Sequence, residues 1–75
     1  MRFKKKYSKT QYVVWVDHDG SSKAFNATID QDLMAGRGQW VAWVDEHRIG
    51  VARSYRDIKL KVEIHIRHLI ENEGN

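Results

Sequence analysis

The 75-residue sequence contains no cysteine and no proline. Without cysteine, disulfides and thiolate-bound metals are excluded as sources of stability, and a domain of this size buries only about 60% of the surface of its unfolded chain. No apolar run approaches the ~18 residues of a membrane-spanning helix, and no signal-peptide pattern is present. We therefore expect a small, soluble, cytoplasmic protein with a modest hydrophobic core.

Acidic side chains are missing from residues 1–9, and the basic ones there are Arg2, Lys4, Lys5, Lys6 and Lys9. The rest of the chain holds the other eight of the 13 basic residues and all ten acidic ones, so the net charge of +3 comes from this N-terminal run. We interpret residues 1–9 as a flexible basic tail and residues 10–75 as a single globular domain. Such a tail can attract phosphate groups or can simply keep the protein in solution.

Four stretches have the composition and alternation of β-strands: Gln11–Asp17, Lys23–Ile29, Gln39–Val44 and Ile49–Arg53. Turn-forming residues separate the members of each pair, Asp17–Gly20 in the first and Asp45–Arg48 in the second. Asp-Gly between apolar runs is a strong hairpin signal. The sequence therefore predicts two β-hairpins in succession.

The stretch Asp57–Ile70 can be read with two periods. With period 2 its apolar residues face one side and its polar residues the other, as in an amphipathic strand. With period 3.6 one helical stripe is apolar, and it consists of Tyr55, Ile58, Val62, Ile66, Leu69 and Ile70. The ends of the stretch favour the helix, because Ser54 and Asp57 have the spacing of a capping box and Gly74 follows as a stop.

These elements predict an α+β fold. An antiparallel sheet of three to four strands, built from the two hairpins, is packed by one C-terminal helix at about residues 55–71. If Asp57–Ile70 were instead a strand, the alternative would be a small all-β barrel or a five-stranded sheet.

The predicted strands are apolar on both faces, although an antiparallel sheet with one wet face should alternate. Trp15 and Trp43 lie on one parity and Trp40 on the other. Leu60 and Ile64 fall on the helix face opposite the core stripe. Because exposed apolar patches usually mark interaction sites, we expect Trp15, Leu60 and Ile64 to form an oligomer or partner interface, in a homodimer or in a complex with another protein.

No motif for catalysis or for a cofactor is present. His65 and His68 are three residues apart, with Glu63 nearby, but the further ligands that a metal site needs are missing. Asp17–Gly20 has a fragment of a calcium loop without the terminal glutamate. No serine or cysteine nucleophile accompanies a histidine in a recognisable setting. We therefore expect a non-enzymatic binding or regulatory protein without a metal, a cofactor or a small-molecule substrate.

Basic and aromatic residues predict a nucleic-acid interface. Arginines on a sheet can read guanine or phosphate in the major groove, tryptophans can stack on unpaired bases, and lysines add an attraction that weakens with salt. The predicted interface, for nucleic acid or another partner, consists of Arg2, Lys4, Lys5, Lys6, Arg37, Trp40, Trp43, Arg48, Arg53 and Arg56. The alternative is a protein-binding inhibitor or adaptor that uses the apolar sheet face against a host protein complex, since arginine and tryptophan are also enriched in protein interfaces.

The segments GQWVAWVDEHRIG and ARSYRDIKLKVEIHIRHLIE lie within residues 37–73. In element order this half of the chain resembles the sheet-then-helix plan of phage integrase arm-binding domains, and also that of small antitoxin domains of the HicB type. The resemblance implies a small phage- or plasmid-type accessory protein.

Overall fold

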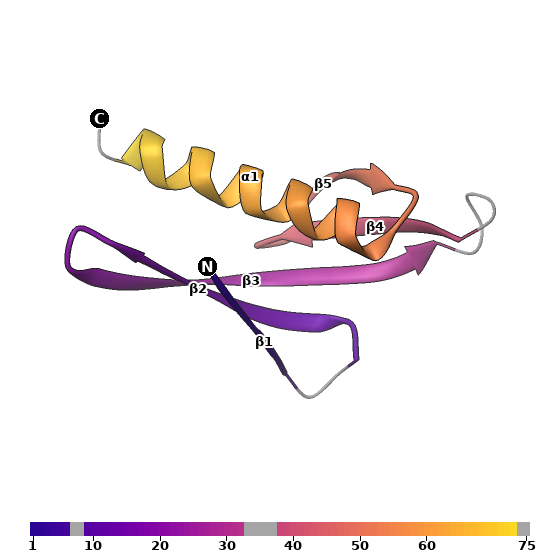
Figure 1. The fold of residues 1–75 in the computed structure, drawn as a ribbon, viewed down its shortest axis with the longest axis horizontal. Coiled ribbons are helices and arrows are strands. Elements are labelled where there is room, and N and C mark those ends of the chain that lie inside the picture. Colours follow the sequence, from indigo (N-terminus) through magenta and orange to yellow (C-terminus); the bar gives the residue numbers. More distant parts are fainter. Residues whose placement is uncertain (7–8, 33–37, 74–75) are drawn as a thin grey trace.

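The computed structural model describes residues 1–6, 9–32 and 38–73. Five antiparallel strands form one open sheet, and one helix lies across it (Figure 1). The elements are β1 (Arg2–Lys5), β2 (Gln11–His18), β3 (Ser21–Asp32), β4 (Gln39–Val44), β5 (His47–Ala52) and α1 (Tyr55–Glu73). The strands lie side by side in chain order, from β1 to β5. The predicted α+β class is confirmed.

Helix α1 confirms the helical interpretation of Asp57–Ile70. The Ser54 hydroxyl accepts a hydrogen bond from the backbone N–H of Asp57 at 3.1 Å. The Ser54 carbonyl accepts one from the N–H of Ile58 at 3.0 Å. Ser54 is therefore the N-cap, and Asp57 sits in the first turn, where the helix dipole favours a negative charge.

Both predicted hairpins form, each with a two-residue turn. Asp19 and Gly20 connect β2 to β3 with φ values of 50° and 76°, and Asp45 and Glu46 connect β4 to β5 with φ values of 47° and 72°. Positive φ at both central positions is the mark of the type I′ turn, whose twist matches that of antiparallel strands. Glycine tolerates this conformation without cost, whereas Glu46 adopts it against its preference.

The fifth strand, β1, corrects the prediction that residues 1–9 are a free tail. Arg2 to Lys5 pair with Trp15 to Tyr12 on β2. Phe3 is the residue that holds this strand, because its half-buried ring packs against the core and meets Tyr12 edge to face at a centroid distance of 6.2 Å. The Lys59 ammonium lies 4.7 Å from the centre of the Phe3 ring, on the helix side. Phe3 thus joins this basic edge strand to the core, in addition to the backbone pairing with β2.

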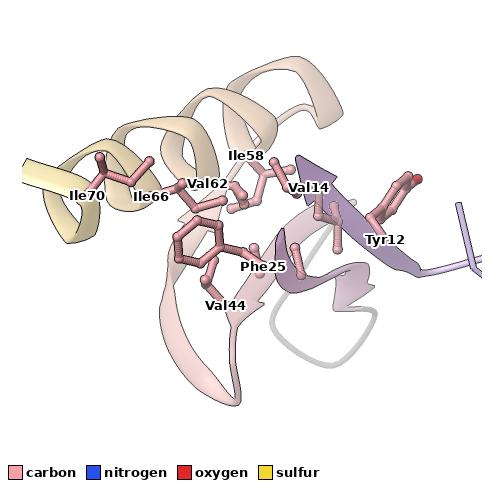
Figure 2. Packing of buried hydrophobic residues seen from close by; sticks show 11 residues of the cluster. Tyr12, Val14, Phe25, Val44, Ile58, Val62, Ile66 and Ile70 are labelled. Atoms are coloured by element: carbon pink, nitrogen blue, oxygen red, sulfur yellow. The ribbon is translucent and has the colours of Figure 1, made fainter. Parts of the chain in front are cut away.

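The hydrophobic core lies between α1 and one face of the sheet (Figure 2). Ile58, Val62 and Ile66 are completely buried and Ile70 nearly so, while Tyr55 and Leu69 are half-buried at the border of the core. The sheet contributes Tyr12, Val14, Phe25, Ala27, Ile29, Ala42 and Val44. The predicted helical stripe is therefore the core-facing side of α1.

Two aromatic contacts fix the start of α1 on the sheet. The Tyr55 hydroxyl lies 3.2 Å from that of Tyr12, at hydrogen-bond distance. Burial, together with this hydrogen bond, raises the pKa of Tyr55 to about 12, so the Tyr55 hydroxyl stays neutral at physiological pH. Trp40 meets the Tyr55 ring edge to face at a centroid distance of 5.3 Å.

In the described part of the chain, no helix combines the length and apolar character that crossing a membrane requires.

Candidate nucleic-acid interface on the open sheet face

The side of the sheet opposite α1 is here called the open face. Helix α1 covers the other side and contacts β3, β4 and β5, as Figure 1 shows. Within residues 1–6, 9–32 and 38–73 no second helix exists to cover the open face. The predicted surplus of apolar strand surface is therefore present on this side, where Trp15 is 39% exposed and Val13 and Trp43 are half-buried.

Strand pairing arranges the open face in rows, because residues directly opposite one another share a face. The first row is Arg2, Trp15 and Ala24; the second is Lys4, Val13 and Asn26; the third is Gln11, Thr28, Trp43 and Arg48; and the fourth is Asp30, Val41 and Val51. Asp17 and Ser22 pair beyond the first row. Each tryptophan of this face thus has an arginine as its neighbour across one pair of strands. A flat aromatic surface beside a cation is the combination that stacks a base and holds its phosphate.

The register separates the predicted site residues into groups. Arg2, Lys4, Trp15, Trp43 and Arg48 come together on the open face. Trp40 and Lys5 do not, since their cross-strand partners are Ala52 and Tyr12, on the helix side of the sheet. The half-buried ring of Trp40 packs against the core and is not available for stacking with a ligand on the open face.

The remaining predicted residues lie elsewhere. Arg53 is exposed between β5 and α1. Arg56, Leu60 and Ile64 belong to α1, which lies on the opposite side of the sheet from the open face. Leu60 and Ile64 are 52% and 45% exposed, as expected for the back of the helix. Arg37 lies outside the described residues.

Acidic groups moderate the positive charge of the open face. Asp17 forms an exposed ion pair with Arg2 at 3.3 Å, and its carboxylate also accepts a hydrogen bond from the Ser22 hydroxyl at 2.6 Å. The Ser22 hydrogen bond, helped by the Arg2 charge, lowers the pKa of Asp17, which keeps it ionised. Arg2 is therefore partly neutralised, and Lys4 and Arg48 carry more of the field that a phosphate would meet.

A hollow of about 630 Å³ lies where the third row of the open face meets the β4–β5 turn. Its lining includes Lys6, Gln11, Asn26, Trp43, Asp45 and Glu46. The Lys6 ammonium donates a hydrogen bond to the side-chain oxygen of Asn26. Its volume falls in the range of 300–1,000 Å³ found for ligand-binding clefts, and its lining is mainly polar.

Most residues that line this hollow carry no signal in the sequence. Gln11, Asn26 and Glu46 carried no motif, and they come from strands and turns up to 35 positions apart in the chain. The strand register brings them together. The two-residue turn sets the pairing of β2 with β3, whereas no two-residue turn joins β3 to β4. Asp45 and Glu46 were recognised as turn residues, but the direction in which a turn presents its carboxylates depends on the φ values of the turn.

The chain matches no protein-family model, and no match was found among the curated proteins or the solved structures. In the described ranges, no group of three or more histidine, cysteine, aspartate or glutamate side chains is arranged to hold a metal ion.

Proposed function

We propose that this protein is a non-enzymatic nucleic-acid-binding protein that holds single-stranded DNA or RNA on its open face. The observation that carries the proposal is the pairing of each open-face tryptophan with an arginine, Trp15 with Arg2 and Trp43 with Arg48. A single strand is favoured over a duplex because only unpaired bases expose the flat surface that tryptophan stacks on. In this arrangement the tryptophan rings stack on the bases, and the cations bind the phosphates.

The distance between Trp15 and Trp43 corresponds to several nucleotides of a single strand. Trp15 and Trp43 have Ala24 and Thr28 as partners on β3, four residues apart. This spacing is about 13 Å along the strand, and the two tryptophans are separated by two strand spacings, so their backbones lie roughly 16 Å apart. At the ~3.4 Å rise of a stacked strand, this distance corresponds to roughly five nucleotides.

The test is fluorescence anisotropy with labelled DNA and RNA oligonucleotides of about 15 nucleotides, single-stranded and duplex, between about 50 and 200 mM salt. We expect the single strands to bind more tightly. The double substitution Lys4→Gln and Lys6→Gln should reduce the slope of log affinity against log salt by about 1.4, because each phosphate contact contributes about 0.7 for a single strand.

A matched control removes the same charge from the other side of the molecule. Lys61 and Arg67 are exposed on α1, and Lys61→Gln with Arg67→Gln should leave the salt slope nearly unchanged. An equal change of slope in both double variants would show that only net charge matters. Absence of binding at the lowest salt would refute the proposal.

A second candidate function is protein binding through the back of α1, first of all to another copy of the chain. Leu60 and Ile64 lie one helical turn apart and are 52% and 45% exposed, so they form a small contiguous apolar patch of the kind that can mark an interaction site. We expect sedimentation equilibrium to give twice the chain mass of 8.8 kDa. Leu60→Ser with Ile64→Ser should restore the monomer, whereas Lys61→Ser with His65→Ser should not. A monomeric wild type at high concentration would argue against the homodimer.

A further inference from the structure

We propose that the hollow beside Trp43 is a nucleobase pocket that selects guanine, an inference that rests on the proposed binding of single-stranded nucleic acid. The hollow is bounded by an aromatic ring, by two carboxylates and by one ammonium group, from Trp43, Asp45, Glu46 and Lys6. This set of groups resolves into a stacking surface, a hydrogen-bonding edge and a phosphate contact.

Backbone and side-chain hydrogen bonds hold the polar wall of this pocket in place. The Asp45 carboxylate accepts a hydrogen bond from the backbone N–H of Asn26 at 3.1 Å, and the Asp45 N–H donates to the Asn26 carbonyl at 2.8 Å. Lys6 in turn donates to the Asn26 side chain. Asp45 is therefore a positioning residue that fixes the turn on β3. Glu46, exposed at the next position with a φ of 72°, is the carboxylate that can turn toward a ligand.

The chemistry of the wall distinguishes the bases. An ionised carboxylate accepts hydrogen bonds and donates none. The Watson–Crick edge of guanine presents two adjacent N–H donors, the ring N–H and the exocyclic amino group, which match the two oxygens of one carboxylate. Adenine and cytosine each place an acceptor beside their amino group, and thymine and uracil have one N–H between two carbonyl oxygens. A base stacked on Trp43 with its edge toward Glu46 is therefore bound well only if it is guanine.

The same carboxylates have an opposite effect on the backbone of the nucleic acid. Glu46 and Asp45 add negative charge at the edge of the open face, and that charge repels phosphate at all sequences. The pocket should thus weaken binding of strands that cannot use it and strengthen binding of strands that can. Removal of the Glu46 carboxylate should therefore have opposite effects on strands with and without guanine, which the loss of a single contact would not produce.

The experiment compares thymine oligonucleotides of about 15 nucleotides that are uniform or carry one central guanine, adenine or cytosine, by anisotropy at fixed salt. The wild type should bind the guanine strand about 5- to 150-fold more tightly than the uniform strand, the range of one bidentate contact to a base. Glu46→Gln should weaken binding of the guanine strand and leave unchanged or strengthen binding of the uniform strand. Glu63→Gln, which removes the same charge from α1, should preserve the guanine preference.

The outcomes distinguish the binding of single-stranded nucleic acid from the selection of guanine. If no oligonucleotide binds, the proposed function fails, and the pocket fails with it. If all four strands bind equally, or if the guanine preference survives Glu46→Gln, the function stands and the guanine pocket is wrong. The experiment also measures the binding of a labelled peptide with one arginine, because a guanidinium also offers paired hydrogen-bond donors to a carboxylate. Binding of that peptide without binding of any oligonucleotide would assign the hollow to a protein partner and overturn the nucleobase pocket.

Discussion

Replacing Ile66 with alanine is expected to lower the free energy of unfolding by about 2–5 kcal/mol. Ile66 is completely buried between α1 and the sheet, so the substitution removes transfer free energy and leaves a cavity that the surrounding strands fill only in part. A domain of this length has a total stability of roughly 4–11 kcal/mol. The loss is thus a large share of the total and should lower the melting temperature by about 10 °C or more.

The chain offers a matched control in Ile64, which lies two positions earlier on the same helix and is 45% exposed. Ile64→Ala should change the stability by no more than about 0.5 kcal/mol, since alanine is also the better helix former. Urea unfolding followed by circular dichroism measures both variants, at a protein concentration low enough to keep the chain monomeric. The midpoint should fall for Ile66→Ala at an unchanged slope. Equal losses at both positions would contradict the helix orientation described here.

Replacing Trp15 and Trp43 with leucine should weaken the binding of single-stranded nucleic acid more than any other pair of substitutions on the open face. Stacking of one base on an aromatic side chain contributes about 1–3 kcal/mol, so each substitution should reduce affinity between about 5-fold and 150-fold. Leucine keeps apolar volume at the half-buried Trp43 and removes only the flat ring. The two effects should add, because residues more than about 10 Å apart seldom interact.

Trp40 provides the comparison for this result. It lies on the helix side of the sheet, edge to face with Tyr55, so Trp40→Phe should leave affinity unchanged even if it lowers stability. Anisotropy titrations of the folded variants, checked by circular dichroism, measure the three positions side by side. If loss of Trp40 weakens binding as much as loss of Trp43, stacking on the open face is not the mode of recognition.

The helix could be predicted from the sequence because its start is a local chemical event. Ser54 and Asp57 are three residues apart, and their hydrogen bond forms within one turn, whatever the rest of the chain does. The core stripe of α1 follows from the same 3.6-residue period. The first hairpin was predictable for a similar reason, since Asp19 and Gly20 set its turn locally. The second hairpin was also predicted, but its turn is Asp45 and Glu46 instead of the expected Asp45–Arg48.

The features that could not be predicted from the sequence depend on contacts between residues that are distant in the chain. The alternation of side chains along the strand predicts that Trp40 and Trp43 lie on opposite faces of the sheet. Which of these faces α1 covers depends on packing between elements. The strand β1 was hidden because a run of lysines around Phe3 has the composition of a tail, and only pairing with β2 makes it a strand. The hollow beside Trp43 depends on the register of β2, β3 and β4. The Asp19-Gly20 turn sets the pairing of β2 with β3, but no two-residue turn sets the pairing of β3 with β4.

The strand order of the sheet also bears on how the molecule folds. Since β1 to β5 follow one another in space as they do in the chain, each new strand can pair as soon as the chain reverses its direction, and α1 then docks mainly on the strands that immediately precede it. Contacts between near neighbours in sequence make for rapid assembly. The edge strand β1 pairs with β2 alone and can open by itself, so its amides should exchange with solvent sooner than those of the central strand β3.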